Sequence, residues 1–222
     1  MNAFQLQDKV ILVVGGAGLI GKTFSSALAE QGSVVIIADI DQAAAEAVAK
    51  KIHDAHPRAR IYPLTIDICD AASIDKTIDA IHARYGQIDA LINCAYPKAK
   101  NYGADFFDIN YTDFCESLNL NLGGYFLTCQ RVCRYFVEQG WGNIINLSSI
   151  YGVSAPRMKL YEGTEMTMPI EYAAMKSALI HMTRFLATFF KGKNIRANCI
   201  SPGGIHDNQH PIFLQRYKEE CL

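Results

Sequence analysis

The stretch Val10-Ile11-Leu12-Val13-Val14-Gly15-Gly16-Ala17-Gly18-Leu19-Ile20-Gly21 decides the fold of this chain. Its first five residues are apolar and mostly β-branched, which is typical of a strand buried on both faces. A glycine-rich loop follows, and a helix is expected from about residue 20 to residue 31. Such a loop lets backbone N–H groups approach a pyrophosphate at the positive end of a helix. A tight strand-to-helix turn without any ligand would also need glycines, but the position after the first strand favours phosphate binding.

Short apolar runs and helical patterns alternate along the rest of the chain. Further strands are expected at 34–38, 61–64, 90–92, 143–147 and 195–200, and further helices at 41–55, 70–86, 112–138 and 171–190. This alternation predicts an α/β fold with one doubly wound parallel sheet of Rossmann type and helices on both faces. No repeat or linker divides the 222 residues, so we expect one domain.

The composition excludes several classes of partner. The net charge of −1 gives no basic excess for a nucleic acid, and the first apolar run is too short to span a membrane. The seven scattered cysteines contain no C-x-x-C pair, which favours buried free thiols in a reducing compartment. We therefore expect a cytoplasmic protein without a metal site. His206 and His210 have no third ligand beside them, so loop chemistry is favoured over metal binding.

An acidic residue follows the second expected strand. Asp39 lies eighteen residues after Gly21, where a carboxylate can accept hydrogen bonds from ribose hydroxyls and repel a 2′-phosphate. No Lys or Arg lies in the glycine loop or directly after Asp39. NAD is therefore favoured over NADP. Asp39 could instead cap the next helix, although Asp41 competes for that position.

Tyr172 and Lys176 have the i, i+4 spacing that places two side chains side by side on a helix. A nearby ammonium favours a phenolate and lowers the pKa of the phenol. Tyr172 would then be a usable acid or base near neutral pH. The spacing alone is common, so this role depends on the groups around it.

Together these motifs resemble the short-chain dehydrogenase/reductase family, in the family's order and over nearly the whole chain. Further matches are Asp67 after the third strand, Asn93 and Ala95 in an N-N-A-G-like turn, Asn121 on a helix, Ser149 after the fifth strand, and Pro202-Gly203 followed by Ile205. The resemblance implies a cofactor site formed by Gly15, Gly18, Leu19, Ile20, Gly21, Asp39, Asp67, Ile68, Asn93, Ala95, Tyr172, Lys176, Pro202, Gly203 and Ile205.

The same resemblance implies four catalytic residues. Tyr172 would donate or accept the substrate proton while hydride moves to or from the nicotinamide, and Lys176 would lower the tyrosine pKa and bind the nicotinamide ribose. Ser149 would polarise the carbonyl, and Asn121 would hold a water that connects Lys176 to solvent. Without such roles, Ser149 would be a strand-end hydroxyl and Asn121 a helix-surface amide.

Two departures from the family pattern bear on the substrate. Leu19 stands where the classical subfamily has a glycine, and the gap between Ser149 and Tyr172 is long. Both features resemble the extended subfamily, which commonly acts on nucleotide sugars, and the gap also resembles oxidoreductases of bacterial surface-glycan and flagellin-modification pathways. A sugar or sugar-derived substrate is implied, although the long segment could also be a surface excursion without substrate contact.

The chain ends at Leu222, inside what the resemblance implies to be a lid, so the usual last strand is expected to be missing. Either the chain is shortened or the gene product is unusual. We expect a single dinucleotide-binding catalytic domain over 1–222, acting as a homodimer or homotetramer that interconverts an alcohol and a carbonyl with NAD. The alternatives are a sugar epimerase or dehydratase that retains its NAD, and a non-catalytic dinucleotide-binding homologue.

Overall fold

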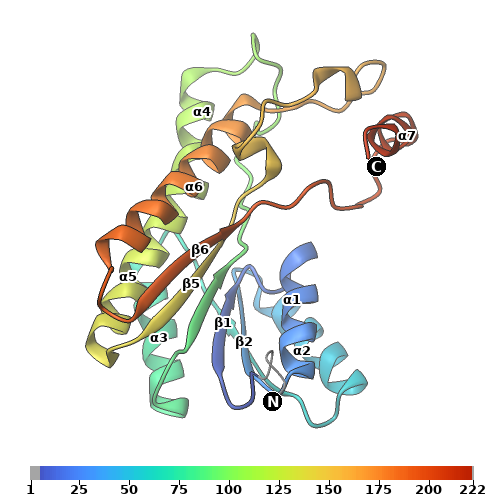
Figure 1. Ribbon diagram of the computed structural model, residues 1–222. Helices are drawn as coiled ribbons and strands as arrows, with labels where there is room; N and C mark the ends of the chain where they lie inside the picture. Colours follow the sequence, from blue (N-terminus) through green and yellow to red (C-terminus); the bar gives the residue numbers. More distant parts are fainter. Residues whose placement is uncertain (1–5, 222) are drawn as a thin grey trace.

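The computed structural model of the protein describes residues 6–221, and its centre is one parallel sheet of six strands. The strand order is β3-β2-β1-β4-β5-β6 (Figure 1). The strands are β1 (Val10–Val14), β2 (Val34–Asp39), β3 (Arg60–Thr65), β4 (Ala90–Asn93), β5 (Gly142–Leu147) and β6 (Ile195–Ile200). The predicted doubly wound parallel sheet of Rossmann type is therefore confirmed.

The described part of the chain contains seven α-helices. They are α1 (Leu19–Glu30), α2 (Gln42–Ala55), α3 (Ala71–Tyr85), α4 (Tyr111–Leu118), α5 (Gly124–Gln139), α6 (Ile170–Phe189) and α7 (Pro211–Glu219). Helices α1 and α2 lie on one side of the sheet, and α3, α5 and α6 lie on the other (Figure 1). The sheet order reverses between β1 and β4, and ligands of doubly wound sheets bind at such a switch point.

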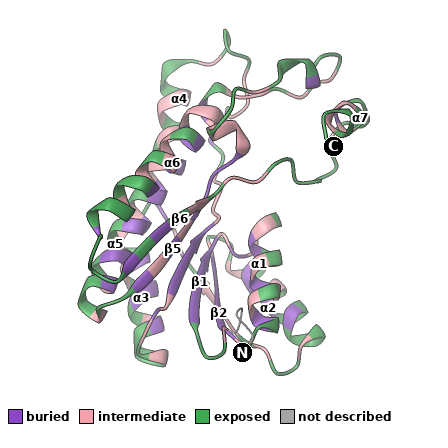
Figure 2. Cartoon of the chain, in the orientation of Figure 1, coloured by how far each residue is buried: buried purple, intermediate pink, exposed green. Residues whose placement is uncertain are grey.

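Two apolar clusters fix the helices to the two faces of the sheet. All five residues of β1 are buried, because alternate side chains enter opposite clusters. Ile11 and Val13 pack with α1 and α2, whereas Leu12 and Val14 pack with α3 and α5. Figure 2 shows β1 and β2 as a buried layer beside helices with exposed outer faces, whereas the edge strand β6 is partly exposed. The continuous apolar runs in the sequence therefore correspond to strands covered on both sides.

The predicted helix ends are formed by specific side chains. Asp41 accepts a hydrogen bond from the Ala44 N–H at 3.0 Å and caps α2, while Asp70 accepts one from Ala72 at 2.9 Å and caps α3. Gly86 ends α3 in the left-handed conformation, with φ of 73°.

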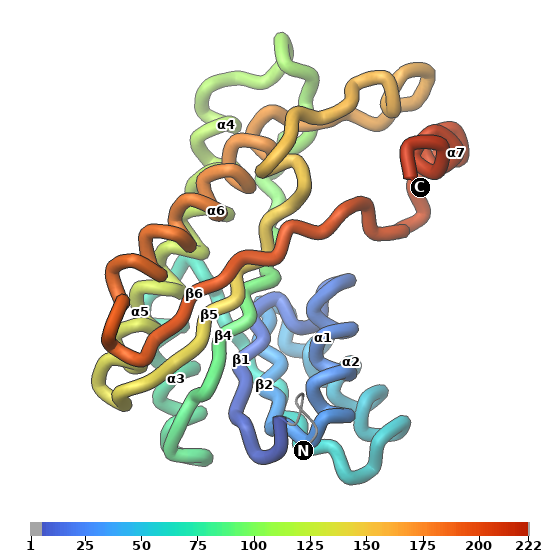
Figure 3. The backbone as a smooth tube through the Cα atoms, viewed as in Figure 1, coloured from blue at the N-terminus to red at the C-terminus, as the bar shows by residue number. Residues whose placement is uncertain are grey.

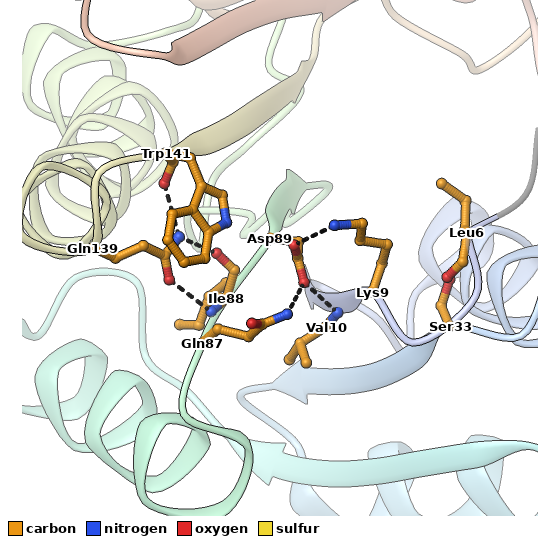
Figure 4. A network of polar contacts seen from close by, with 9 residues as sticks. All are labelled: Leu6, Lys9, Val10, Ser33, Gln87, Ile88, Asp89, Gln139 and Trp141. Carbon is orange, nitrogen blue, oxygen red and sulfur yellow. Dashed lines mark hydrogen bonds and ion pairs between the residues drawn. The ribbon is translucent and has the colours of Figure 1, made fainter.

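A polar network lies at the amino-terminal ends of β1 and β4 (Figure 4). The Asp89 carboxylate accepts hydrogen bonds from the Val10 N–H and the Gln87 side chain and forms an ion pair with Lys9 at 2.9 Å. Beside it, the Gln139 side chain exchanges two hydrogen bonds with the backbone of Ile88. These contacts tie the start of β1 and the end of α5 to the segment before β4.

Three features differ from the sequence expectations. The helix expected over 112–138 consists of α4, a π-helical turn over Asn119–Gly123, and α5. Helix α7 was not assigned from the sequence pattern, since the end of the chain was expected to lie in a lid or in the helix after it. The seven cysteines are free, but Cys69 and Cys221 are exposed because both lie outside the helices and strands.

None of the described helices is long and apolar enough to cross a membrane. Within residues 6–221, no group of three or more His, Cys, Asp or Glu side chains is placed to hold a metal ion. His210 instead caps α7 by accepting a hydrogen bond from the Ile212 N–H at 3.2 Å.

Candidate active site

A cavity of about 850 Å³ opens at the carboxyl ends of the strands. It is lined by most of the residues that the sequence predicted for the site, namely Gly15, Gly18, Leu19, Ile20, Gly21, Asp39, Asp67, Ile68, Ala95, Ser149, Tyr172, Lys176, Pro202, Gly203 and Ile205. Residues from the loops after all six strands thus line the same cavity. This is the ligand position expected for a doubly wound sheet.

The glycine loop forms a close backbone turn between β1 and α1. Gly15 has φ of 72°, and a Cβ on it would lie 2.6 Å from the backbone of Ala95. A Cβ on Gly21 would collide with the Gly15 carbonyl oxygen, so α1 can begin this close to the loop only with glycine there. The loop and the N-terminus of α1 therefore form a cradle of backbone N–H groups, which is suited to a pyrophosphate.

Asp39 stands at the end of β2 beside this cradle. Its carboxylate accepts hydrogen bonds from the Ala17 N–H at 3.1 Å and the Asp41 N–H at 3.3 Å, and it lines the cavity. Because Asp41 caps α2, Asp39 is left to face a ligand. Lys98 and Lys176 are the two basic residues that line the cavity in the described chain, and both belong to the end that holds Tyr172.

Asp67 and its neighbours form the wall beyond Asp39. The Asp67 carboxylate accepts a hydrogen bond from the Cys69 N–H at 2.8 Å, and the backbone N–H of Asp67 donates one to Ser73 Oγ at 2.9 Å. The side chains of Ile66 and Ile68 are buried on either side. An apolar slot with a fixed polar edge suits a heteroaromatic base.

Tyr172 and Lys176 project from the first two turns of α6. The Lys176 ammonium donates a hydrogen bond to the Leu147 carbonyl oxygen at 2.9 Å and lies 5.7 Å from the centre of the Tyr172 ring. Ser149 follows β5, and its hydroxyl accepts a hydrogen bond from the Tyr151 N–H at 3.2 Å. Ser148 instead donates to the Lys176 carbonyl oxygen at 2.6 Å and so anchors α6.

The electrostatics of this pair differ from the expectation. Burial raises the pKa of Tyr172 above its ordinary value, and the neighbouring Ser149 hydroxyl opposes the increase. Burial also lowers the pKa of Lys176 to about 8. The net shift of the Tyr172 pKa is therefore upward, because desolvation disfavours the phenolate. The role of Lys176 in lowering that pKa stays a prediction.

Asn93 and Asn121 lie behind the cavity wall, in contrast to the other predicted site residues. Asn121 is in the π-helical turn, and its amide donates to the carbonyl oxygens of Pro97 at 2.8 Å and Ser117 at 3.0 Å. Asn93 is completely buried, and its carbonyl oxygen accepts a hydrogen bond from Tyr125 at 2.8 Å. Both asparagines therefore shape the backbone around the site.

An aromatic wall around Tyr172 was missed by the sequence analysis. The Tyr96 ring packs edge-on to Tyr172 with 5.7 Å between ring centres, and its hydroxyl is hydrogen-bonded to that of Tyr102. Tyr96 stands where the family turn has glycine, so this departure from the pattern was the available signal. Burial raises the pKa of Tyr96, which keeps its phenol neutral.

The segment between Ser149 and Tyr172 also belongs to the site. Tyr151, Tyr161, Met166, Thr167, Met168 and Pro169 line the cavity, so this segment is placed where it can contact a ligand bound there. Helix α7 lies beside this segment at the end of the chain (Figure 3). Phe213 packs on Tyr161 with 5.2 Å between ring centres, and Tyr217 accepts a hydrogen bond from the Gly204 N–H at 2.6 Å. The two segments jointly enclose the Tyr172 end.

Comparison with known proteins identifies the family. Residues 9–211 match the model of the family described as short chain dehydrogenase. This chain belongs to the short-chain dehydrogenase family. As a short-chain dehydrogenase it is an oxidoreductase, and the predicted resemblance is confirmed.

The relatives of this short-chain dehydrogenase are named for different activities and roles. Post-translational flagellin modification protein A of Campylobacter coli is 36% identical over 97% of this chain and 84% of its own length. D-threitol dehydrogenase of Mycolicibacterium smegmatis is 32% identical over 90% of this chain and 71% of its own. The crystal structure of a short-chain dehydrogenase from Leptospira borgpetersenii with bound NAD⁺ has a TM-score of 0.82 and 33% identity, over 96% of this chain and 78% of that one.

Proposed function

We propose that this short-chain dehydrogenase interconverts an alcohol and a carbonyl with NAD, using Tyr172 as the acid or base. The observation that carries this proposal is the meeting of Ser149, Tyr172 and Lys176 with the glycine cradle and Asp39 in one cavity. NAD, when bound, would accept or supply the hydride. The protein supplies the proton-transfer group and the positions of the reactants.

Each polar residue at the Tyr172 end has a distinct proposed role. The Tyr172 hydroxyl exchanges the proton with the substrate oxygen, and the Ser149 hydroxyl donates a hydrogen bond to that oxygen. Lys176 supplies positive charge that stabilises a phenolate and binds the nicotinamide ribose. Asn121 acts as a positioning residue, because its amide holds the Pro97 carbonyl at the edge of the site.

Asp39 supports NAD as the cofactor. Its carboxylate is fixed at the end of β2 by two backbone N–H groups, where it can accept hydrogen bonds from ribose hydroxyls. A 2′-phosphate there would meet a negative charge without a cation that could neutralise it. The NAD⁺ bound by the similar Leptospira protein agrees with this assignment.

A polyhydroxylated substrate is favoured over a purely apolar one. The wall near Tyr172 carries the hydroxyls of Tyr96, Tyr102, Tyr151 and Tyr161, on rings that can also cover the apolar face of a sugar. D-threitol dehydrogenase and the flagellin modification protein are relatives whose names are compatible with such a substrate.

A substrate panel tests the proposal. The protein is incubated with NAD and with sugars, polyols or simple alcohols, while NADH formation is followed by absorbance. We expect net NADH from at least one polyhydroxylated compound. Turnover with retained cofactor and no net NADH would support an epimerase or dehydratase instead, and absence of any turnover or cofactor binding would overturn the proposal.

A further inference from the structure

The substrate end of the cavity holds a cation that no described side chain neutralises. Lys98 lines the cavity, and it makes no hydrogen bond or ion pair with any residue in 6–221. The other cavity-lining cation, Lys176, is buried and bonded to the Leu147 carbonyl oxygen. A free ammonium beside a reaction centre is available to a ligand.

Nearby arginines are already occupied. Arg157 forms an ion pair with Glu220, and Arg216 donates hydrogen bonds to the carbonyl oxygens of Lys159 and Glu162. These contacts join α7 to the segment before α6. Neither arginine lines the cavity, so Lys98 is the available cation at this end of the described structure.

Lys98 is solvent-exposed and lies beside Tyr96. Its ammonium lies 6.0 Å from the centre of the Tyr96 ring, and that ring lies 5.7 Å from the ring of Tyr172. One aromatic ring therefore separates the Lys98 ammonium from Tyr172. The residue before Lys98 is anchored by the Asn121 amide, and the Tyr96 ring is fixed by Tyr102.

The acidic residues around the cavity leave this cation unpaired. Asp39 and Asp67 lie at the far end, beside the glycine cradle and the apolar slot. Glu171 is completely buried and accepts a hydrogen bond from the Gly103 N–H at 3.4 Å, and it does not line the cavity. Asp207 lines the cavity after β6 but makes no ion pair with Lys98.

We propose that Lys98 binds an anionic group, a phosphate or a carboxylate, on a sugar-type substrate whose reacting carbinol faces Tyr172. This proposal rests on the proposed function, because Tyr172 defines the reacting end. Because the Tyr96 ring lies between Lys98 and Tyr172, the anionic group would be at the end of the substrate remote from the reacting carbinol. The Lys98–anion contact would then fix which carbinol reaches Tyr172.

Matched probes and variants test the proposal. Glucose 6-phosphate, gluconate and glucose are titrated by calorimetry into the NAD-saturated protein and its variants, and any probe that is turned over is assayed for kcat and KM. We expect at least one anionic probe to bind more tightly than glucose, with a preference that declines as salt is added. The substitution Lys98→Met should lower the affinity for that probe by about 10- to 100-fold, as expected for loss of a charged hydrogen bond, and should leave the affinity for glucose unchanged.

The controls separate charge at the site from charge in general. Lys100→Met removes an exposed lysine two residues away that does not line the cavity, and it should leave all three affinities unchanged. Lys98→Arg should retain the preference for the anion. The proposal would be overturned if Lys98→Met lowered the affinity for anionic and neutral probes equally, or if Lys100→Met lowered it as much as Lys98→Met does. It would also be overturned if no anionic probe bound.

Failure of the proposed function gives a different result. In that case no compound is oxidised or reduced, yet the calorimetric comparison of Lys98→Met with Lys100→Met still decides whether an anion binds at Lys98.

Discussion

Tyr172 and Lys176 respond to the same burial with opposite shifts in pKa. Burial disfavours both the phenolate and the ammonium, so the tyrosine pKa rises and the lysine pKa is lowered to about 8. Lys176 is therefore the member of the pair that titrates nearest to neutral pH. Its charge state controls how well the site can stabilise negative charge on Tyr172.

The lowered lysine pKa predicts a pH dependence. For carbonyl reduction both the Tyr172 phenol and the Lys176 ammonium must be protonated, so kcat/KM should be constant at lower pH and fall as the pH rises through about 8. Replacing Lys176→Arg, whose guanidinium does not deprotonate in this range, should move the fall to higher pH. A pH–rate profile that is the same in both proteins would contradict this assignment.

Asp39 predicts the cofactor preference. We expect the wild type to bind NADH more tightly than NADPH, and Asp39→Ala to narrow that difference by about tenfold or more, because a hydrogen bond to a charged group is lost and a repulsion is removed. Isothermal titration calorimetry with both cofactors measures this. Asp41→Ala is the control, since it removes the α2 cap and lowers stability without changing the preference.

At the residue scale, motif order predicted much of the cavity but not its aromatic wall. Asp39, Ser149, Tyr172 and Lys176 lie together because each follows a strand or begins a helix at the same edge of the sheet. Contacts such as Tyr161 on Phe213 join segments far apart in the sequence, and no local pattern encodes them. Asn121 matched a motif, yet its position behind the cavity depends on the π-helical turn.

At the element scale, the apolar periodicity of 112–138 concealed a change of helical register. The extra residue of the π-helical turn rotates the faces of the helix that follows it, so that Tyr125 and Cys129 are buried whereas Phe126 is 53% exposed. The turn is followed by Gly124, where a Cβ would lie 2.5 Å from the Ile68 side chain. Helix α7 was missed because the sequence marks only its start, with His210 as the N-cap and Pro211 as the first helical residue. The loop before it is rich in polar residues.

The end of α5 supports a stability prediction. Gln139→Ala should lower the free energy of unfolding by about 1–3 kcal/mol, because it leaves the buried N–H and C=O groups of Ile88 without partners. Thermal or urea unfolding measures the change. The neighbouring control Glu138→Ala, at an exposed position whose side chain makes no hydrogen bond within residues 6–221, should have little effect. Equal losses would show that helix propensity, rather than the Ile88 contacts, is responsible.

At the scale of the whole molecule, strand order decides where the chemistry takes place. Alternating strands and helices were enough to predict one parallel sheet, and the glycine loop after the first strand predicted which edge binds a ligand. The parallel sheet, with its reversal between β1 and β4, brings the loops after all six strands to one cavity. The enclosure of the Tyr172 end depends on α7 and the segment before α6, whose mutual contacts the sequence pattern does not contain.

The most direct test of the central claim compares the wild type with Tyr172→Phe at saturating NAD and a substrate identified from the panel. Tyr172→Phe should lower kcat by about 100- to 10,000-fold, the contribution expected of a positioned acid or base, while NAD binding stays largely intact because the ring is kept. Tyr111→Phe, at an exposed tyrosine, is the control and should retain full activity. Turnover by Tyr172→Phe at the wild-type rate would contradict the assignment of Tyr172 as the proton-transfer group.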